Sequence, residues 1–464
     1  MRGLRRSFSG ALFECGDAGY EAARKVWNGS VDRRPALIAR CRTVSDVVGA
    51  VRLARDMQLD LAVRGGGHNV AGFGTCDGGI VADLSLLNYV VVDPRRRLAW
   101  AQGGVTWGAF DHETHRFGLA TPGGQVSSTG IGGLTLGGGI GWLVRKYGLS
   151  CDNVVSVDLV AADGSCFRAN ADENADLFWG VRGGGGNFGV VTKFEYRLHP
   201  VSAVYAGLVF HPLTRADEVL RFLRDFAAEA ADELSMFVVI GTPWTDGAFI
   251  RTHGVVPVIS VWACYCGPSG KGINAMAQLK NFGTPMVEEF REMSYPALQR
   301  LMDAGAPSGL QNYAKAEYVT GLTDSLIDAV IRSAETIPSI QSQVIIGQLG
   351  GAMQRVAESD SAFSHRASPY VVNVLPMWNA GGVSEVHMDW AESLWDELRR
   401  CSTGGVYVNF LGVEGVDRTI AAYGEEKYAC LARLKDKYDP ANVFHLNQNI
   451  APRGTREPDG RVRS

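Results

Sequence analysis

Runs of glycine crowd one stretch of this chain and constrain its fold more than any other feature. The 464 residues include 57 glycines, about 12% against about 7% in an average protein. Between residues 65 and 189 they form GGG at 65–67 and 137–139, GGGG at 183–186, and GG pairs that begin at 78, 103, 123 and 132. Segments rich in Val, Ile, Leu and aromatic residues separate these runs, which therefore predict loops between core elements rather than a flexible linker. The backbone must approach something closely there.

Composition bounds the class of protein. Hydrophobic residues make up 46% and charged residues 20%, a globular balance, and the length predicts two domains. The formal net charge is -4, and no basic stripe with interleaved aromatic residues occurs, so we expect no nucleic-acid partner. No run of 18 apolar residues occurs, so we expect no membrane span and a cytoplasmic protein. The nine cysteines are scattered without a CxxC pair, so we expect reduced thiols and no metal site.

The first 200 residues predict a mixed α+β structure with many short strands. Residues 43–57 have apolar positions at helical spacing, with Ser45 available as a cap. Turn residues separate the strands of two expected hairpins. The expected helices cover 43–57 and 106–117, the expected strands 59–64 and 79–84, and the hairpins 90–101 and 155–169.

Longer elements follow Pro200, and their alternation suggests an antiparallel sheet covered by helices on one face. We expect helices at 216–231, 273–282, 324–337 and 383–399, and strands at 234–240, 258–264, 344–348 and 370–375. A last segment, 425–437 followed by YDPANVFHLNQNI, is expected to return to loop chemistry at the C-terminus. The expected domain limits are 1–205, 206–424 and 425–464, the last being a C-terminal segment that returns to the first domain.

The motif RGGGHN at residues 64–69 follows an expected strand. Successive glycines let backbone N–H groups converge on an anion such as a pyrophosphate. The motif is neither a GxGxxG nor a P-loop, so it does not predict a Rossmann site. Taken alone, His68 would more often be structural than functional.

The order of four motifs is more specific. RGGGHN is followed by TPGGQVSSTGIGGLTLGGGIGWLVRKYG at 121–148, DLFWGVRGGGGNFGVVTKFEY at 176–196 and YDPANVFHLNQNI at 438–450. This series resembles the berberine-bridge-type, or PCMH-type, FAD-linked oxidases over the first 200 residues and the tail. The resemblance implies an α+β fold with a vanillyl-alcohol-oxidase-like FAD-binding domain and an antiparallel sheet domain covered by helices.

The resemblance also implies a cofactor and its ligands. FAD would be bonded to His68, and Val126 stands where family members with a second link carry a cysteine, so a single histidyl link is expected. Thr129 is aligned with the position that admits oxygen beside the flavin. Asn447 and Asn449 would bond the polar end of the flavin, although capping of the terminal loop is the alternative. The remaining implied cofactor-binding residues are Arg64, Gly65, Gly66, Gly67, Asn69, Gly124, Ser127, Ser128, Gly130, Gly133, Leu134, Gly138, Gly139, Gly141 and Val190.

Phe410 bears on the substrate. Sugar and alcohol oxidases of the family have a tyrosine base after the asparagine of this motif, whereas this chain has Phe410 after Asn409. A neutral amine can lose a hydride without such a base, so we expect an oxidase that takes a hydride from a small, amine-type or secondary-metabolite-like substrate and passes electrons to oxygen. If a base is required, the candidates are Tyr407, Asp360, Tyr313, Tyr370, His365 and His387.

Two other readings stay open. A sugar or alcohol oxidase, or a dehydrogenase, of the same family would use a substituted base, and a flavin-binding carrier would have no activity. Reduction of the flavin by a small substrate without oxygen would discriminate between them. Composition does not decide between a monomer and a homodimer.

Overall fold

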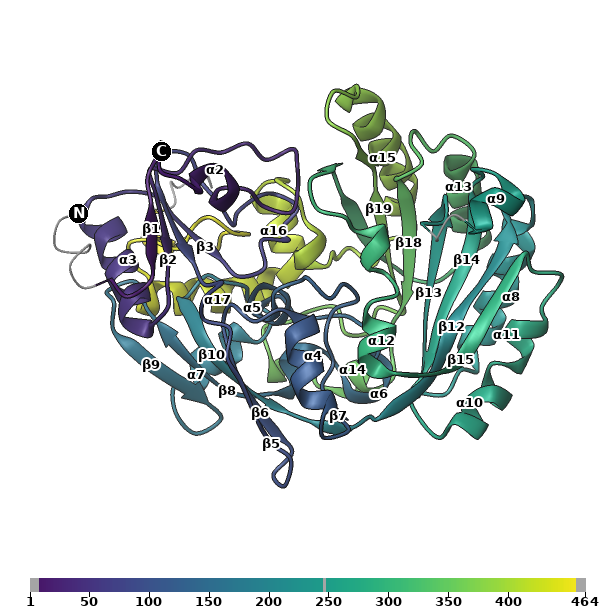
Figure 1. Cartoon of the computed structure of the whole chain (residues 1–464), viewed down its shortest axis with the longest axis horizontal. Helices are drawn as coiled ribbons and strands as arrows, with labels where there is room; N and C mark the ends of the chain where they lie inside the picture. Colours follow the sequence, from purple (N-terminus) through teal and green to yellow (C-terminus); the bar gives the residue numbers. More distant parts are fainter. Residues whose placement is uncertain (1–7, 245–247, 456–464) are drawn as a thin grey trace.

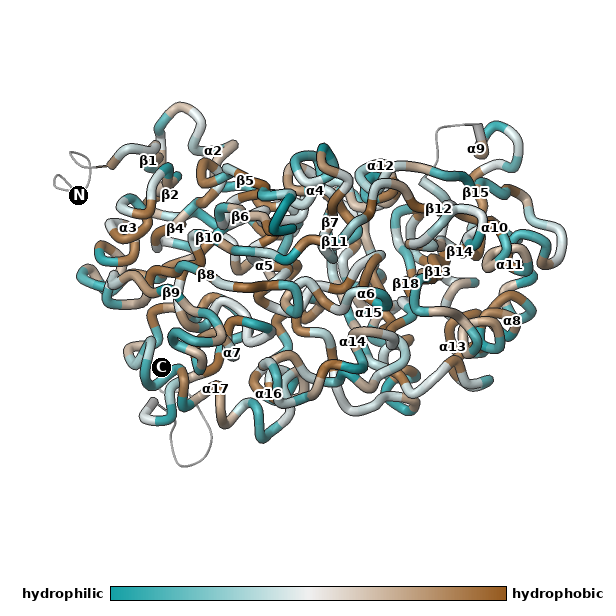
Figure 2. The backbone as a smooth tube through the Cα atoms, turned by 90° about the horizontal axis from the view of Figure 1, so that it is seen from below, coloured by the Kyte–Doolittle hydropathy of each residue, from teal (hydrophilic) through white to brown (hydrophobic). Residues whose placement is uncertain are grey.

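The computed structural model describes residues 8–244 and 248–455, which form two halves side by side (Figure 1). One half contains the first 200 residues together with the C-terminal segment, and the other contains the residues between them. Strand β13 of the second half is coloured as hydrophobic over most of its length in Figure 2, and buried apolar side chains form a large cluster in the first half and another in the second. Each half therefore has its own apolar interior, as the length and composition predicted.

A four-stranded sheet in the order β1-β2-β4-β3 opens the first half. The helix α3 leads from β2 to β3 and begins after Thr43, whose Oγ1 accepts the Asp46 N–H at 3.2 Å while the Asp46 carboxylate accepts the Thr43 N–H at 3.0 Å. The helix is confirmed, but its cap is Thr43 rather than Ser45, because this reciprocal pair satisfies two N–H groups at once. The elements are β1 (Ala11–Phe13), α2 (Tyr20–Ala23), β2 (Leu37–Arg40), α3 (Val44–Asp56), β3 (Leu61–Arg64) and β4 (Ile80–Asp83).

A five-stranded antiparallel sheet in the order β5-β6-β10-β8-β9 follows. Both predicted hairpins are confirmed, one as β5 with β6 and the other as β8 with β9. The elements are β5 (Val90–Asp93), β6 (Leu98–Gln102), α4 (Trp107–His115), β7 (Leu119–Ala120), α5 (Ile131–Leu136), α6 (Val144–Tyr147), η1 (Ser150–Asn153), β8 (Val154–Val160), β9 (Cys166–Asn170), α7 (Ala175–Val181), β10 (Val190–Arg197) and β11 (His199–Pro200).

The second half is built on a seven-stranded antiparallel sheet in the order β15-β12-β14-β13-β18-β19-β17. The domain boundary expected between residues 205 and 206 falls inside strand β12 of this sheet. The three expected domain ranges remain predictions. The strands are β12 (Ala203–Pro212), β13 (Leu234–Gly241), β14 (Val258–Tyr265), β15 (Val287–Ser294), β17 (Lys315–Val319), β18 (Gln343–Gln348) and β19 (Tyr370–Leu375), with a separate pair β16 (Gln311–Asn312) and β20 (Met377–Trp378).

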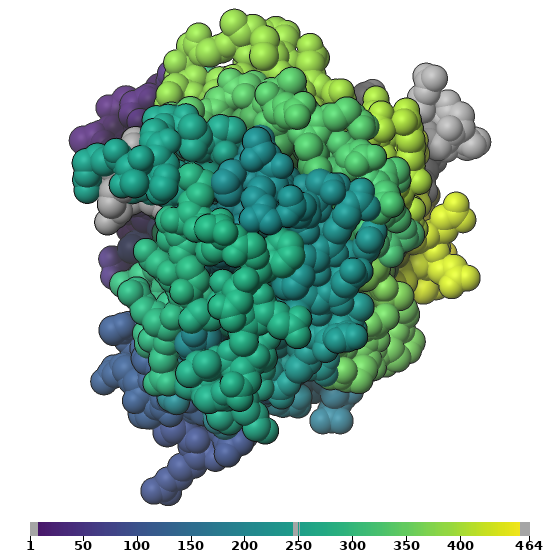
Figure 3. Space-filling view, turned by 90° about the vertical axis from the view of Figure 1, so that its right-hand side faces the viewer, coloured from purple at the N-terminus to yellow at the C-terminus, as the bar shows by residue number. Residues whose placement is uncertain are grey.

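Helices cover the face of this sheet that points away from the first half, as predicted (Figure 1), and Figure 3 shows residues of the second half on this side of the molecule. Apolar side chains of α8, α13 and α15 form one buried cluster with those of the strands. Two helices of the second half, α12 and α14, instead contact α4 and α6 of the first half. All the helices of the second half are η2 (Leu213–Arg215), α8 (Ala216–Ala228), α9 (Ala248–His253), α10 (Ser269–Ala275), α11 (Ala277–Asn281), α12 (Tyr295–Gln299), η3 (Asp303–Gly305), α13 (Asp324–Ala334), α14 (Ala352–Arg355), η4 (Glu358–Asp360) and α15 (Ser384–Arg399).

The helix expected over 273–282 is wrong in its extent. Two short helices, α10 and α11, stand there instead and meet at the fully buried Met276. Met276 has a φ of -97° and a ψ of 1°, outside the α-helical values, so the backbone turns there between α10 and α11.

The C-terminal segment, taken from Val406 onward because Val406, Val408 and Leu411 pack in the core of the first half, returns to that half. Its helices are η5 (Val408–Phe410), α16 (Val416–Tyr423), α17 (Glu425–Tyr438) and η6 (Arg453–Thr455), and Figure 1 shows α17 beside α7 and the five-stranded sheet. Inside α17 and the loop after it, Lys435 and Asp439 form an ion pair of 2.7 Å in which both side chains are 0% exposed. Residues 456–464 of the expected C-terminal segment lie outside the described residues.

Within residues 8–244 and 248–455, no helix is long and apolar enough to cross a membrane. No group of three His, Cys, Asp or Glu side chains in these ranges could hold a metal ion. The nine cysteines are all free, and burial raises the pKa of Cys266 to about 11.

Candidate active site

One cavity of about 400 Å³ lies between the two halves. The glycine loops of the first half form one wall, the sheet of the second half forms another, and the C-terminal segment adds Asn409, Phe410 and Asn447. Residues more than 400 positions apart in sequence therefore meet at one site. The predicted cofactor-binding residues that line it are Arg64, Gly65, Gly66, Gly67, His68, Asn69, Gly124, Thr129, Gly130, Gly133, Leu134 and Asn447.

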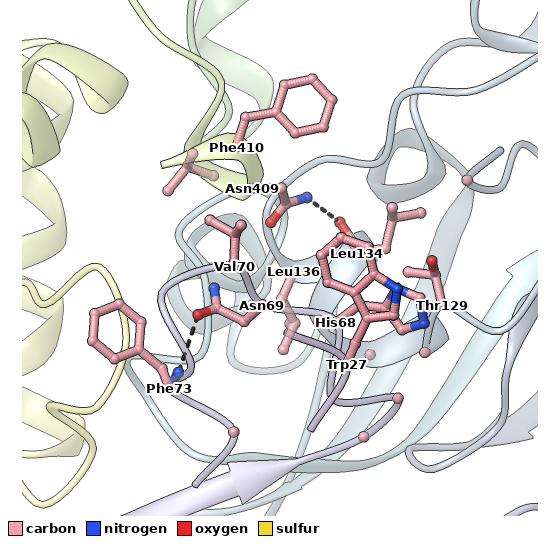
Figure 4. Close-up of a pocket in the computed structure, with 18 of the residues that line it drawn as sticks. Trp27, His68, Asn69, Val70, Phe73, Thr129, Leu134, Leu136, Asn409 and Phe410 are labelled. Carbon is pink, nitrogen blue, oxygen red and sulfur yellow. Dashed lines mark hydrogen bonds between the residues drawn. The ribbon is translucent and has the colours of Figure 1, made fainter. Parts of the chain in front are cut away.

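His68 follows β3 in the loop that the RGGGHN motif predicted. Its ring stacks on Trp27 with centroids 5.3 Å apart and an angle of 16° between the planes (Figure 4). Its Nε2 lies 2.9 Å from Ser128 Oγ. Burial lowers the pKa of His68 to about 4, with a smaller opposite effect from Asp303. The imidazole is neutral at neutral pH, and when Nε2 donates to Ser128, Nδ1 keeps a lone pair with which it can attack carbon.

Two glycines make the wall beside His68. A Cβ atom on Gly66 would collide with the backbone N of Gly130, and one on Gly130 would collide with the N of Gly66. The two loops thus touch through bare backbone. At Gly133 and Gly186, which line the cavity, a Cβ atom would meet no protein atom within 4 Å. Such a backbone-lined space fits a large planar group joined to a pyrophosphate, and hence FAD.

Arg64 anchors this wall rather than standing free in the cavity. Its Nη2 lies 2.9 Å from Asp83 Oδ2, and the two side chains are 7% and 2% exposed. Burial works against the charge of Asp83, yet Arg64 and Arg40 lower the pKa of its carboxyl. The pair ties β3 to β4, and Asn69 Oδ1 accepts the Phe73 N–H at 3.1 Å on the far side of the loop (Figure 4). The RGGGHN loop is therefore held at both ends.

The tail supplies acceptors that lack partners in the described residues. Asn447 donates through Nδ2 to the Phe444 carbonyl at 3.0 Å, while its buried Oδ1 has no hydrogen-bond partner. Asn449 Oδ1 is also buried without a partner, although Asn449 does not line the cavity. An unsatisfied buried acceptor costs about 1–3 kcal/mol. At Asn447 an N–H group of a bound flavin would satisfy it.

Several predicted cofactor residues face protein instead. Ser127 donates its N–H and Oγ–H to Asp303 at 2.8 and 2.6 Å. A Cβ atom on Gly138, Gly139 or Gly141 would collide with Phe363, Ser150 or the Gly123 carbonyl, so these glycines allow close packing of the chain on itself. Val190 points into the core beside β4, and its neighbour Val191 lines the cavity instead, since successive strand residues face opposite sides.

Of the three leading base candidates, the structure brings only Tyr407 to the cavity. Asp360 is exposed in η4. Tyr313 donates its hydroxyl to Glu392, and burial raises its pKa. Neither side chain lines the cavity, since the Tyr313 hydroxyl is directed to Glu392 of α15 and Asp360 is exposed.

Tyr407 is poorly placed to accept a proton. The N–H groups of Gly139 and Ile140 and the Asn409 Nδ2 donate to its oxygen at 3.0, 3.3 and 2.8 Å. Burial raises its pKa to about 12, although these donors lower it. The phenol keeps its proton at neutral pH, and N–H groups occupy its lone pairs. Phe410 packs edge-on against it with ring centroids 4.8 Å apart.

Other residues that line or support the cavity had no signal in the sequence. Trp27 stacks on His68 from an isolated loop, and Asp303 holds Ser127 from the second half. The side chains of Trp244, Gln343 and Asn373 line the cavity from that half. They come from separate elements without a common motif.

Comparison with known proteins places this site in a family. The profile described as an FAD binding domain matches residues 35–170, and the one described as berberine and berberine like matches residues 406–451. An FAD-linked oxidoreductase of Dictyostelium discoideum is 34% identical over 96% of this chain and 95% of its own length. The (R)-6-hydroxynicotine oxidase of Paenarthrobacter nicotinovorans is 31% identical over 97% and 98%.

The chain belongs to the berberine-bridge family of FAD-linked oxidoreductases. The crystal structure of 6-hydroxy-D-nicotine oxidase from Arthrobacter nicotinovorans matches it with a TM-score of 0.87 and 30% identity, over 96% of this chain and 98% of that one. The resemblance inferred from four motifs is thereby confirmed, and with it the two-part FAD-oxidase fold. The protein is an FAD-binding oxidoreductase, and its relatives include named oxidases.

Proposed function

We propose that this berberine-bridge-type enzyme is an oxidase that carries FAD on His68 through a single histidyl link. The observation that carries the proposal is the neutral imidazole at the cavity wall, with Nε2 beside Ser128 Oγ and its ring fixed against Trp27. FAD, when bound, accepts the hydride that the substrate carbon loses. Val126 lines the cavity where a second, cysteinyl link would need sulfur, and no cysteine lines it among the described residues.

Oxygen is the proposed final electron acceptor. Thr129 lines the cavity next to the His68 loop, and its side chain is nearly isosteric with valine, small enough to leave a path for oxygen. The relatives named as oxidases support this choice over a dehydrogenase. The protein supplies position and surroundings, while the redox chemistry resides in the cofactor.

The proposed substrate is a small organic molecule whose oxidation needs no side-chain base, as for an amine or a secondary-metabolite-like compound. Tyr407 holds its own proton, and Phe410 cannot accept one. Tyr423 also lines the cavity, but burial raises the pKa of its phenol, so it keeps its proton as well. A sugar or alcohol oxidase would need a base of lower pKa on this wall.

The test of the link is acid precipitation of the purified protein. The wild type should give a yellow pellet with a flavin-bearing His68 peptide in a digest, and His68→Ala should give a colourless one. Ser165→Ala, a change of an exposed turn far from the cavity, is the control and should stay yellow. Release of free flavin from the wild type would contradict the covalent link.

The test of the activity is separate. Flavin bleaching by members of a metabolite panel under anaerobic conditions, reversed by air with formation of peroxide, is the expected result. A yellow protein that no substrate reduces would support the carrier reading instead, and one that air does not reoxidise would be a dehydrogenase.

A further inference from the structure

The substrate side of the cavity is one face of the large sheet. Strands β13, β18 and β19 lie side by side, with Phe237 opposite Gly347 and with Gly347 opposite Val371. Directly paired residues point to the same face of a sheet, and this face lines the cavity. The sheet wall, as we name it, consists of Phe237, Gln343, Ile345, Gly347, Val371, Asn373 and Leu375.

The sheet wall carries no charge. All its side chains are apolar or amide, and Arg64 is the one Asp, Glu, Lys or Arg that lines the cavity within residues 8–244 and 248–455. Arg64 lies on the glycine-loop side and is already paired with Asp83. An ionised ligand group in such a place loses water without gaining a counter-ion, which costs several kcal/mol.

Two amides on the sheet wall are incompletely bonded. Gln343 is 3% exposed and donates through Nε2 to the Gly305 carbonyl at 3.1 Å, which leaves its buried Oε1 without a partner. Asn373 is 7% exposed, and its Oδ1 has no partner either. Because Asn373 pairs with Ile345, two residues along β18 from Gln343, the two amides are diagonal neighbours on one face. They offer two acceptors to one bound molecule.

The remaining wall is shaped for a ring. Gly347 leaves bare backbone between two apolar side chains, since a Cβ atom there would lie 2.9 Å from the Phe237 ring and 3.2 Å from Val371. The Trp244 ring also lines the cavity, and its buried Nε1 has no partner. A flat apolar surface with a few polar atoms at its border is typical of a site for an aromatic or polycyclic molecule.

We propose that the sheet wall binds an uncharged, ring-containing substrate that donates hydrogen bonds, through O–H or N–H groups, to Gln343 Oε1 and Asn373 Oδ1. This rests on the proposed function, because it takes the cavity as the substrate site of the oxidase. It narrows the amine expectation, since a protonated amine finds no carboxylate on the described wall. A carboxylate ligand would find no unpaired cation there, since Arg64 already pairs with Asp83.

The test uses four probes with one ring system and the flavin-loaded enzyme. They are 2-naphthol, which is neutral with a donor; 2-methoxynaphthalene, which is neutral without one; 2-naphthoate, an anion; and 2-naphthylmethylamine, a cation at pH 7. Binding is measured by titration calorimetry and by the shift of the flavin absorption band. We expect 2-naphthol to bind at least tenfold tighter than each of the other three, because only it satisfies the amide oxygens without burying a charge.

Two variants and a matched control locate the effect. Gln343→Met and Asn373→Leu should each weaken 2-naphthol at least tenfold and leave 2-methoxynaphthalene within about threefold. Gln348→Met is the control, because Gln348 lies on the same strand, is 5% exposed, also has an unpartnered Oε1 and donates to the Ala227 carbonyl, yet does not line the cavity. It should leave all four affinities unchanged.

Three results would overturn the inference: binding of the anion or cation as tight as that of 2-naphthol, equal effects of Gln343→Met and Gln348→Met, or no binding of any probe. Calorimetry reports binding whether or not the flavin is covalently linked or reduced. Failure of the His68 link or of turnover would therefore appear in other measurements and leave this result readable.

Discussion

The buried ion pair of the C-terminal segment lends itself to a quantitative test. Lys435 Nζ lies 2.7 Å from Asp439 and also donates to the carbonyls of Asn187 and Phe444 at 2.8 Å each. Lys435→Met keeps most of the aliphatic chain and removes the charge and its three hydrogen bonds. The Asp439 carboxylate would then be buried without a counter-ion, which costs about 3–5 kcal/mol.

The assay is the thermal midpoint of the flavin-loaded protein. A chain of this length that unfolds as one unit has an unfolding entropy on the order of 1 kcal/mol per kelvin, so the midpoint should fall by about 4 °C. Lys437→Met is the control, because Lys437 pairs with Asp176 at 2.6 Å from the same helix, but the side chains are 58% and 46% exposed. That change should cost less than about 1 kcal/mol. Equal shifts for the two variants would refute the reasoning from burial.

Three further predictions concern the cavity and its surroundings. Phe410→Tyr should leave oxidation of the best substrate within about tenfold in stopped-flow reduction, since the wild type needs no phenol at that position; a gain of a hundredfold would show that a base was missing. Asp303→Asn should slow covalent incorporation of added FAD at least tenfold without unfolding the protein, because its carboxylate holds Ser127 beside the His68 partner, and an unchanged rate of flavin fluorescence gain in denaturing gels would contradict this. Burial raises the pKa of Asp111 to about 7, above its ordinary value near 4, so its contribution to stability is fully present below about pH 4 and is lost as the pH rises through 7, by up to about 4 kcal/mol. About 1–2 kcal/mol of this is already lost at pH 5, so the excess of Asp111→Asn over the wild type in thermal midpoint should be clearly larger at pH 8 than at pH 5, and a constant difference between those two pH values would count against the raised pKa.

Local signals explain which elements were predictable. The hairpin of β8 and β9 was predictable from the turn residues Asp163 and Gly164, and Gly164 has a φ of 79°. Helix α8 was predictable from the helical spacing of its apolar residues. Strand β15 was missed because Glu288, Glu289 and Arg291 dominate it and its residues are half-buried or exposed. Its pairing with β12 along the edge of the sheet defines it, and such long-range pairing leaves no period in the sequence.

In the candidate site, too, some residues could be predicted from the sequence and others could not. The RGGGHN loop could be found because its glycines are contiguous and the backbone itself does the work. Gln343 and Asn373 could not, because their relation is the register of β18 against β19. The sequence likewise does not show which face of β10 meets the core. In the structure Val190 points into the core and Val191 into the cavity.

The two ends of the cavity wall have a consequence for synthesis on the ribosome. The loop around His68 is made early, but Asn447 and Gln448, which also line the cavity, are added on the order of 20–80 s later at ordinary elongation rates. Lys435 then fastens this last segment to Asn187 and Phe444. A nascent chain that has not reached Lys435 lacks this wall, so the cavity can be enclosed only after the C-terminal segment has been made.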